Sequence, residues 1–151
     1  MRLNFKLILY IIGLLLIFNG SAMLITSFVS LILDDGVTNQ IAISSILLIT
    51  SGLILMLFNK NNLKQLSKRD GYVIVTIGWL TMIFSGMLPY YLTNSISSFS
   101  NIFFETMSGY TATGSTILDD VESLPKSIIF WRSVTPVSYT HLTLPTRRFV
   151  W

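Results

Sequence analysis

Small hydroxyl residues surround a lone glycine in the segment of the chain best suited to ion chemistry. Residues 111–116 read Thr-Ala-Thr-Gly-Ser-Thr, with the glycine at Gly114, and they directly follow a short apolar stretch, Phe99–Tyr110. Backbone carbonyls in such a loop can replace the hydration shell of a cation. Non-helical backbone at membrane depth is tolerated only where it is buried in protein or lines a water-filled path. Ion permeation is therefore the leading hypothesis, provided that the loop lies within a membrane.

The composition predicts an integral membrane protein. The 151 residues are 52% hydrophobic and 11% charged, with a mean hydropathy of +0.67. Soluble domains carry about 25% charged residues, roughly twice this fraction. The absence of cysteine excludes disulfides and thiolate metal sites. The net charge of +3 fits orientation in a lipid bilayer better than nucleic-acid binding, which needs a basic stripe on a folded surface.

Three apolar stretches have about the 20 residues that crossing a bilayer requires. We expect these spans at Leu7–Leu33, Ile41–Phe58 and Tyr72–Leu92. Basic residues precede the first span and lie between the second and third, whereas the loop after the first span carries only acidic residues. The positive-inside rule then places the N-terminus and the 59–70 loop in the cytoplasm. An all-α, multi-pass membrane protein follows.

The stretch Phe99–Tyr110 is too short to span a bilayer and has the length of a re-entrant segment. Helical periodicity puts Phe99, Ile102, Phe103 and Thr106 on one face. A helix that lies flat on the outer surface is the alternative interpretation of this pattern.

Isolated polar residues within the apolar segments are the next candidates, because ionisable groups at such positions are costly and usually functional. We expect Glu105 to be held by hydrogen bonds behind the loop, a role that we favour over direct ion coordination. Arg132, about one turn into the last apolar segment, could snorkel outward or pair with Glu105. Asn19 in the first span is expected to make a helix-packing contact.

The sequence predicts no enzyme. It contains no Ser-His-Asp set, no phosphate-binding loop and no paired carboxylates in a plausible cleft. The single histidine, His141, supports neither a metal site nor a general base. The acidic residues Asp119, Asp120 and Glu122 could concentrate cations at an outer mouth or belong to an ordinary solvated loop.

Ordered short strings along the chain carry a family resemblance. They are Lys68–Gly71, Gly86–Tyr90, Phe103–Thr116, Leu124–Lys126 and Phe130–Ser133. Together they resemble the Trk/Ktr/HKT superfamily of potassium transporters, and its TrkH-type members most closely, over about residues 1–134. The resemblance implies potassium uptake across the inner membrane of a bacterium, with potassium as the transported ion and no cofactor.

The family fold implies four repeats in one polypeptide, each with a helix, a re-entrant pore helix with a filter loop, and a second helix. By this resemblance, residues 1–70 hold two additional N-terminal helices and a cytoplasmic loop. Residues 71–134 hold the first repeat, incomplete in its second helix. The chain would then be an N-terminal fragment that does not transport by itself. A homodimer and a cytoplasmic nucleotide-binding regulatory subunit are also implied.

The filter residues are carried over by position. Gly114 matches the single filter glycine of each repeat, and Thr111, Ala112, Thr113 and Ser115 match the positions beside it. Potassium would bind the carbonyls of Thr113 and Gly114. Glycine suits this role because it adopts the positive φ angles that turn consecutive carbonyls toward one axis.

Residues Glu105, Gly109 and Tyr110 are expected to support the loop from the pore helix. The carboxyl end of that helix would add partial negative charge facing the cation. An ordinary helix cap is the alternative role for Gly114. At the level of the whole chain, the alternatives are a small non-conducting structural membrane protein and a subunit of an oligomeric cation channel.

Residues 135–151 depart from the family pattern. Pro136 is a poor continuation of a helix only about ten residues long, and the Arg147–Arg148 pair does not extend the span. The segment also resembles a translated library-adapter string. We therefore expect the last helix to end near Val134 and the tail to be non-native.

Overall fold

The computed structural model describes residues 4–59, 68–118 and 124–143, and the regular structure in these ranges is helical. Its elements in chain order are α1 Phe5–Leu33, α2 Thr38–Asn59, α3 Lys68–Gly86, α4 Leu88–Leu92, α5 Phe99–Tyr110 and α6 Lys126–Thr143. Three stretches are long and apolar enough to cross a membrane, namely α1, α2 and Arg69–Leu92. The predicted all-α membrane class and its three spans are therefore confirmed.

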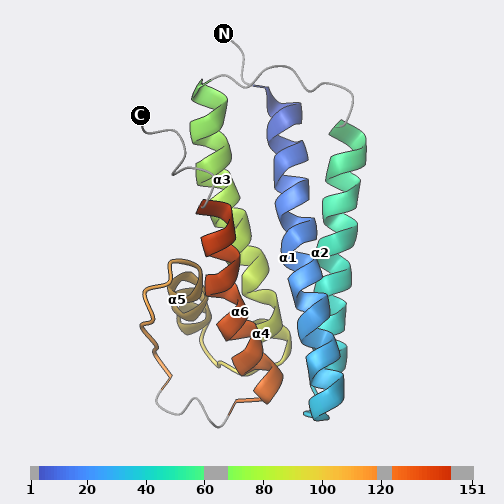
Figure 1. The fold of residues 1–151 in the computed structure, drawn as a ribbon, viewed down its shortest axis with the longest axis vertical. Coiled ribbons are helices and arrows are strands. Elements are labelled where there is room, and N and C mark those ends of the chain that lie inside the picture. The colour runs from blue at the N-terminus through green and yellow to red at the C-terminus, as the bar shows by residue number, and fades with distance from the viewer. Residues whose placement is uncertain (1–3, 60–67, 119–123, 144–151) are drawn as a thin grey trace.

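Helices α1 and α2 form a closely packed antiparallel hairpin (Figure 1). Glycines lie where the two helices meet, and a Cβ on Gly13 would lie 2.7 Å from the carbonyl oxygen of Gly52. Small residues allow membrane helices to approach this closely. At the start of α1, the side chain of Asn4 accepts a hydrogen bond from the Leu7 amide at 3.4 Å, the usual role of an N-cap asparagine.

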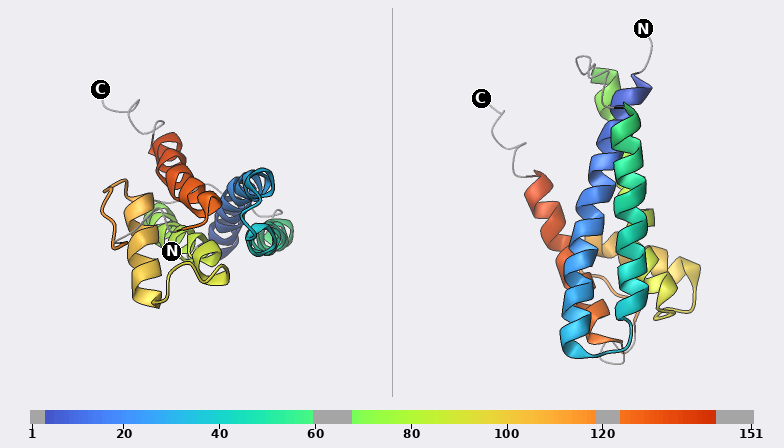
Figure 2. Two further views of the ribbon diagram at one scale, coloured as in Figure 1. Left: turned by 90° about the horizontal axis from the view of Figure 1, so that it is seen from below. Right: turned by 90° about the vertical axis from the view of Figure 1, so that its right-hand side faces the viewer.

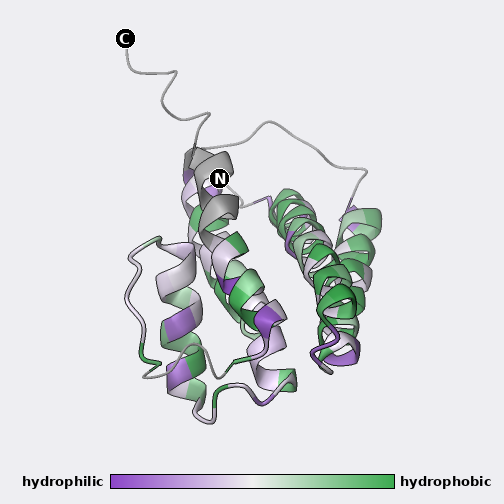
Figure 3. Ribbon diagram, turned by 60° about the horizontal axis from the view of Figure 1, so that its bottom comes forward, coloured by the Kyte–Doolittle hydropathy of each residue, from purple (hydrophilic) through white to green (hydrophobic). Residues whose placement is uncertain are grey.

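Large apolar side chains cover the outward faces of the long helices. Figure 3 shows α1 and α2 coloured as hydrophobic over most of their length. The most exposed of these side chains include Phe28, Ile32, Leu57, Phe58 and Tyr72. Soluble monomers rarely expose contiguous apolar surface of this extent, whereas a bilayer would cover it.

The third predicted span, Tyr72–Leu92, is interrupted near its end. Helix α3 gives way to α4 across a turn at Met87. Pro89 has no N–H with which to continue the hydrogen-bond pattern of α3, so the break has a local cause. The indole nitrogen of Trp131 in α6 donates to the Gly86 carbonyl at 3.3 Å, which ties this break to α6.

Helix α5 lies across the direction of the long helices. Figure 1 shows it nearly end-on, beside the lower half of α3 and the middle of α6, and Figure 2 shows it lengthwise. Its bounds, Phe99–Tyr110, are those predicted from the sequence. Because α5 lies alongside the long helices rather than beyond their ends, the arrangement favours a re-entrant helix over a surface helix.

The core lies where α1, α2, α4 and α6 meet. Its most completely buried apolar side chains are Met23, Ile41, Tyr90, Ile128 and Trp131. These side chains come from both the hairpin and the remaining helices. The core therefore fixes the α1–α2 hairpin against the part of the chain that carries α5.

Helix α6 continues beyond its predicted end, through Pro136 to Thr143. Proline leaves the carbonyl of Arg132 without its usual helical donor, and Thr135 Oγ1 donates to that carbonyl at 2.9 Å. Hydroxyl side chains that satisfy a freed carbonyl are one way in which membrane helices tolerate proline. The sequence pattern missed this compensation. The non-native origin of residues 135–151 stays a prediction.

The loop between α1 and α2 caps the start of α6. Asp35 Oδ2 accepts a hydrogen bond from the Ser127 amide at 2.9 Å, and a carboxylate stabilises a helix N-terminus. Ser30 Oγ donates to Asp35 Oδ1 at 2.5 Å. Burial raises the pKa of the Asp35 carboxyl, but hydrogen bonds from Ser127, Ser30 and Val37 outweigh burial and hold the pKa below its ordinary value.

Candidate functional site

A turn of left-handed backbone closes the carboxyl end of α5. The Thr113 amide donates to the Ser108 carbonyl, and the Ala112 amide donates to the Gly109 carbonyl, both at 3.2 Å. This pair of bonds is the Schellman arrangement, in which the residue after the helix cap takes a positive φ. Ala112 occupies that position with φ 52°, although glycine is usual there. The conformation costs an L-residue about 1–2 kcal/mol.

The threonine hydroxyls of the loop stabilise the same turn. Thr111 Oγ1 donates to the Met107 carbonyl at 2.8 Å and lies 2.6 Å from Thr113 Oγ1. The carbonyls of Met107, Ser108 and Gly109 also accept hydrogen bonds from loop amides. The side chains therefore shape the loop, and the negative end of the α5 dipole is partly satisfied by the loop itself.

Gly114 supports the second left-handed step of the loop, with φ 73°. A Cβ at this position would meet nothing within 4 Å, so glycine serves the backbone conformation and not a close contact. In the described part of the chain, no hydrogen bond reaches the carbonyls of residues 111–114. These four oxygens are available to a ligand.

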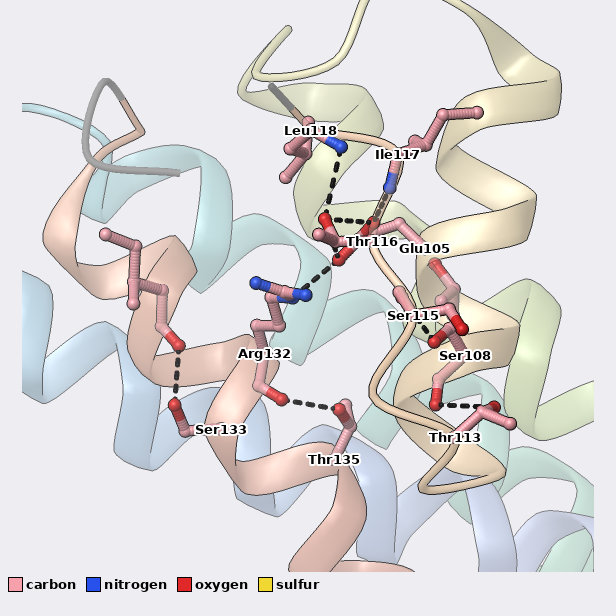
Figure 4. A network of polar contacts seen from close by, with 12 residues as sticks. Glu105, Ser108, Thr113, Ser115, Thr116, Ile117, Leu118, Arg132, Ser133 and Thr135 are labelled. Atoms are coloured by element: carbon pink, nitrogen blue, oxygen red, sulfur yellow. Dashed lines mark hydrogen bonds and ion pairs between the residues drawn. The ribbon is translucent and has the colours of Figure 1, made fainter. Parts of the chain in front are cut away.

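The Ser115 carbonyl differs from the four before it. Ser108 Oγ in α5 donates to this oxygen at 2.5 Å (Figure 4). The bond draws the Ser115 carbonyl toward α5. Of the five residues predicted to form the filter, Ser115 is the one whose carbonyl already has a donor.

Glu105 anchors the part of the loop that follows Ser115. Its side chain is 1% exposed. Its Oε2 accepts hydrogen bonds from Thr116 Oγ1 at 3.1 Å and from the Ile117 amide at 3.2 Å (Figure 4). The Glu105 carboxylate is thus held by hydrogen bonds from the loop, and its supporting role for a filter stays a prediction.

Arg132 of α6 forms an ion pair with Glu105. Its Nε lies 2.5 Å from Glu105 Oε1, and its side chain is 24% exposed. Pairing is thus the alternative that the structure adopts, in place of an outward snorkel. Because charge-assisted hydrogen bonds are stronger than neutral ones, the pair is well suited to join α5, α6 and the loop.

Helix α6 approaches α5 closely at Gly109. A Cβ on Gly109 would lie 2.6 Å from Thr135 Oγ1. A recess of about 260 Å³ lies between α6 and the loop, lined by Ser108, Gly109, Ala112, Gly114, Ile129, Arg132 and Ser133. Because the positively charged residue Arg132 lines this recess, the recess suits a cation less well than the exposed carbonyls of the loop do.

Tyr110, the last residue of α5, is held by the middle of α1. Its hydroxyl donates to Asn19 Oδ1 at 2.8 Å, and Asn19 Nδ2 donates to Ser85 Oγ at 2.6 Å. Asn19 is the central residue of Phe5–Leu33, the longest apolar helix. The loop that follows Tyr110 therefore starts level with the midpoint of a spanning helix.

Ser108 and Thr116 were not singled out from the sequence. A hydroxyl in the last turn of a short helix is a weak signal, because such residues commonly cap their own helix. Ser108 meets Ser115, and Thr116 meets Glu105, only because the loop folds back along α5 (Figure 4).

The remaining candidate side chains lie outside what the structure describes. Asp119, Asp120 and Glu122 lie outside the described residues, and the side chain of His141 is not among those described. Within the described ranges, no group of three or more His, Asp or Glu side chains could hold a metal ion.

Comparisons with known proteins show which proteins the chain is similar to. Residues 37–146 match the family model TrkH, described as a cation transport protein. Over 133 residues the chain is 32% identical to the Trk system potassium uptake protein TrkH of Salmonella typhimurium. The aligned region covers 87% of this chain and 28% of that protein. It is also 32% identical to an uncharacterized cation transporter of Methanocaldococcus jannaschii, over 83% of this chain and 26% of that protein.

A solved structure shares the fold. The crystal structure of the potassium transporter TrkH from Vibrio parahaemolyticus superposes with a TM-score of 0.79 at 32% sequence identity, covering 86% of this chain and 28% of that chain. The chain thus spans between a quarter and a third of the length of these relatives.

Proposed function

The chain belongs to the TrkH family of cation transport proteins, and from this premise we propose that it forms one of four parts of a potassium uptake pathway in a bacterial inner membrane. Relatives at 32% identity are named potassium uptake proteins. These relatives are transporters, and no enzymatic step is proposed. The apolar helices make the chain a multi-pass membrane protein.

The depth of the loop carries this proposal. Tyr110 contacts Asn19 at the centre of α1, so the four carbonyls of residues 111–114 begin near mid-membrane with no competing donor in the described chain. Carbonyl oxygens at such a depth can replace the water that potassium sheds. We assign ion binding to Thr113 and Gly114, with Thr111 and Ala112 beside them.

Ser115 takes a supporting part in this proposal. Its carbonyl accepts the Ser108 hydroxyl, so its position in the loop is set by α5. Glu105 and Arg132 act in the same way on the next residues, since the carboxylate holds Thr116 and Ile117. The side chains behind the loop thus fix the carbonyls that face the ion.

The wider arrangement follows the family. Residues 71–134 are proposed as the first of four repeats, and residues 1–70 as the two preceding helices with their cytoplasmic loop. The N-terminus lies in the cytoplasm by the positive-inside rule, which rests partly on basic residues of the 60–67 segment, outside the described ranges. A homodimer and a cytoplasmic nucleotide-binding regulatory subunit complete the proposal.

A chimera tests the filter assignment. Residues 1–134 replace the aligned segment of the Vibrio parahaemolyticus transporter, and potassium-dependent growth is measured in an uptake-deficient bacterium. Gly114→Ser is expected to lower the ratio of potassium to sodium uptake at least tenfold, because serine disfavours φ 73°. Gly71→Ser is the matched control, since a Cβ there also meets nothing within 4 Å. The 151-residue chain alone is expected not to restore growth.

The outcome separates the proposal from its alternatives. If Gly114→Ser and Gly71→Ser leave the same ion ratio, the loop is no filter and a non-conducting structural role is favoured. Growth rescue by the chain alone would favour an oligomeric channel. If the large chimera does not reach the membrane, residues 99–118 alone are grafted into the same transporter. Gly114→Ser is then tested in this smaller graft, with a serine substitution at the host position aligned with Gly71 as the control.

A further inference from the structure

A buried chain of hydrogen bonds connects three helices at the carboxyl end of α5. Tyr110 Oη donates to Asn19 Oδ1 at 2.8 Å, and Asn19 Nδ2 donates to Ser85 Oγ at 2.6 Å. Ser85 Oγ in turn donates to the Met82 carbonyl at 3.1 Å. Asn19, Ser85 and Tyr110 are 2%, 5% and 3% exposed. The asparagine amide therefore uses both of its ends to join α1 with α3 and α5.

The backbone of α3 leaves room for this contact. A Cβ on Gly86 would lie 2.6 Å from Tyr110 Cε2 and 2.8 Å from Tyr110 Oη. The tyrosine ring thus occupies the space that any side chain at Gly86 would need. Packing against Gly86 and the hydrogen bond to Asn19 together fix both the ring and the hydroxyl of Tyr110.

The position of Tyr110 gives this contact its consequence. The next residues, Thr111, Ala112 and Thr113, donate their amides to carbonyls in the last turn of α5. Any tilt or fraying of that turn would carry the loop with it. Asn19 belongs to α1, which packs mainly against α2 and makes smaller contacts with α3 and α6. The Asn19 amide adds a contact between this hairpin and the start of the loop.

We infer that the α1–α2 hairpin is a positioning element for the filter loop, acting through the hydrogen bond from Tyr110 to Asn19. This role for the hairpin rests on the proposed function, because the loop matters only if it faces an ion. The bond is shielded from solvent, because Asn19 and Tyr110 are both almost completely buried. An interhelical hydrogen bond in a bilayer shifts the equilibrium between packed and separated helices by about 3- to 30-fold.

Amide hydrogen exchange on the 151-residue chain in lipid nanodiscs tests the inference. Asn19→Leu and Tyr110→Phe are each expected to raise the exchange rates of the amides of residues 111–113 by about 3- to 30-fold. Tyr110→Phe removes only the hydroxyl and keeps the ring against Gly86, so it remains informative if Asn19→Leu fails to fold. The double variant is expected to match the single variants, because all three lose the same bond.

Thr26→Val is the matched control on the same helix. Thr26 is fully buried, and its hydroxyl donates to the Ala22 carbonyl of α1 itself at 3.1 Å. The control is expected to leave exchange of residues 111–113 unchanged. Unchanged exchange in Tyr110→Phe, an equal effect of Thr26→Val, or additive effects of the two single variants would each overturn the inference.

A second readout separates this inference from the proposed function. In the chimera, Tyr110→Phe is expected to lower the potassium to sodium uptake ratio about threefold or more, by the same coupling. If amide exchange responds while the ion ratio stays fixed for both Tyr110→Phe and Gly114→Ser, the hydrogen bond positions the loop but the filter assignment is wrong. If Gly114→Ser alone changes the ratio, the filter stands and the positioning role of Asn19 fails.

Discussion

Removing the charge of Arg132 is the sharpest perturbation of the loop scaffold. Arg132→Met keeps much of the aliphatic length and leaves Glu105, 1% exposed, with only the neutral donors of Thr116 and Ile117. Removing one partner of a buried pair costs about 3–5 kcal/mol. Because the Arg132 side chain is 24% exposed, solvent weakens the pair, and we expect a loss near the lower end, about 3 kcal/mol.

The double variant Glu105→Gln/Arg132→Met provides the internal check. Glu105→Gln alone replaces charged hydrogen bonds by neutral ones and is expected to cost about 2 kcal/mol. With both changes no unpaired charge remains, and the glutamine oxygen can still accept the Ile117 amide. We expect the double variant to lose about 3 kcal/mol in total, so that the coupling between the two positions is about 2 kcal/mol.

Equilibrium unfolding in mixed detergent micelles measures these free energies. Trp131, 1% exposed and adjacent to Arg132, reports unfolding by fluorescence in a background with Trp79→Phe and Trp151→Phe. Lys126→Met, at an exposed residue in the first turn of α6, is the control and should change stability by about 0.5 kcal/mol or less. Strictly additive losses for Glu105→Gln and Arg132→Met would refute the reasoning, because the two side chains would then act independently.

Two further predictions use the same unfolding measurement. Ala112→Gly removes the backbone strain of an alanine at φ 52° and is expected to stabilise the chain by about 1 kcal/mol. A loss of stability would show that the alanine methyl makes a contact that outweighs this strain. Hydrogen bonds hold the pKa of Asp35 below its ordinary value in the folded chain, so its contribution is fully present above the unfolded pKa of about 3.9 and is lost as the pH falls through the folded value. Asp35→Asn should flatten this acid-side decline, and an unchanged decline would assign it to other carboxyls.

The spans and α5 were predictable because their signals are local. Runs of apolar residues fixed the spans, and the bounds of Phe99–Tyr110 followed from a polar connector on one side and the hydroxyl loop on the other. A left-handed Gly114 could likewise be expected, since glycine is the residue that adopts this backbone without cost. Local sequence failed at Pro136, where the Thr135 hydroxyl replaces the missing helical donor and α6 continues.

The scaffold of the loop was predictable only as a set of alternatives. From the sequence, Arg132 could either extend toward solvent or pair with Glu105. Asn19 was expected to make a helix-packing contact, but its partner could not be named. Tertiary structure chose the ion pair at 2.5 Å and the bond between Asn19 and Tyr110, which are 91 residues apart in the chain. No periodicity links residues at that separation.

The sequence by itself determined that this chain is a helical membrane protein with a glycine-centred hydroxyl loop, because hydropathy, helix length and backbone freedom are properties of short segments. Tertiary structure alone decided which oxygens of the loop stay available. The Ser108 hydroxyl takes the Ser115 carbonyl, while the carbonyls before it meet no donor among the described residues. Hydrogen bonds between distant segments depend on how α1, α5 and α6 pack, and packing is a property of the whole fold.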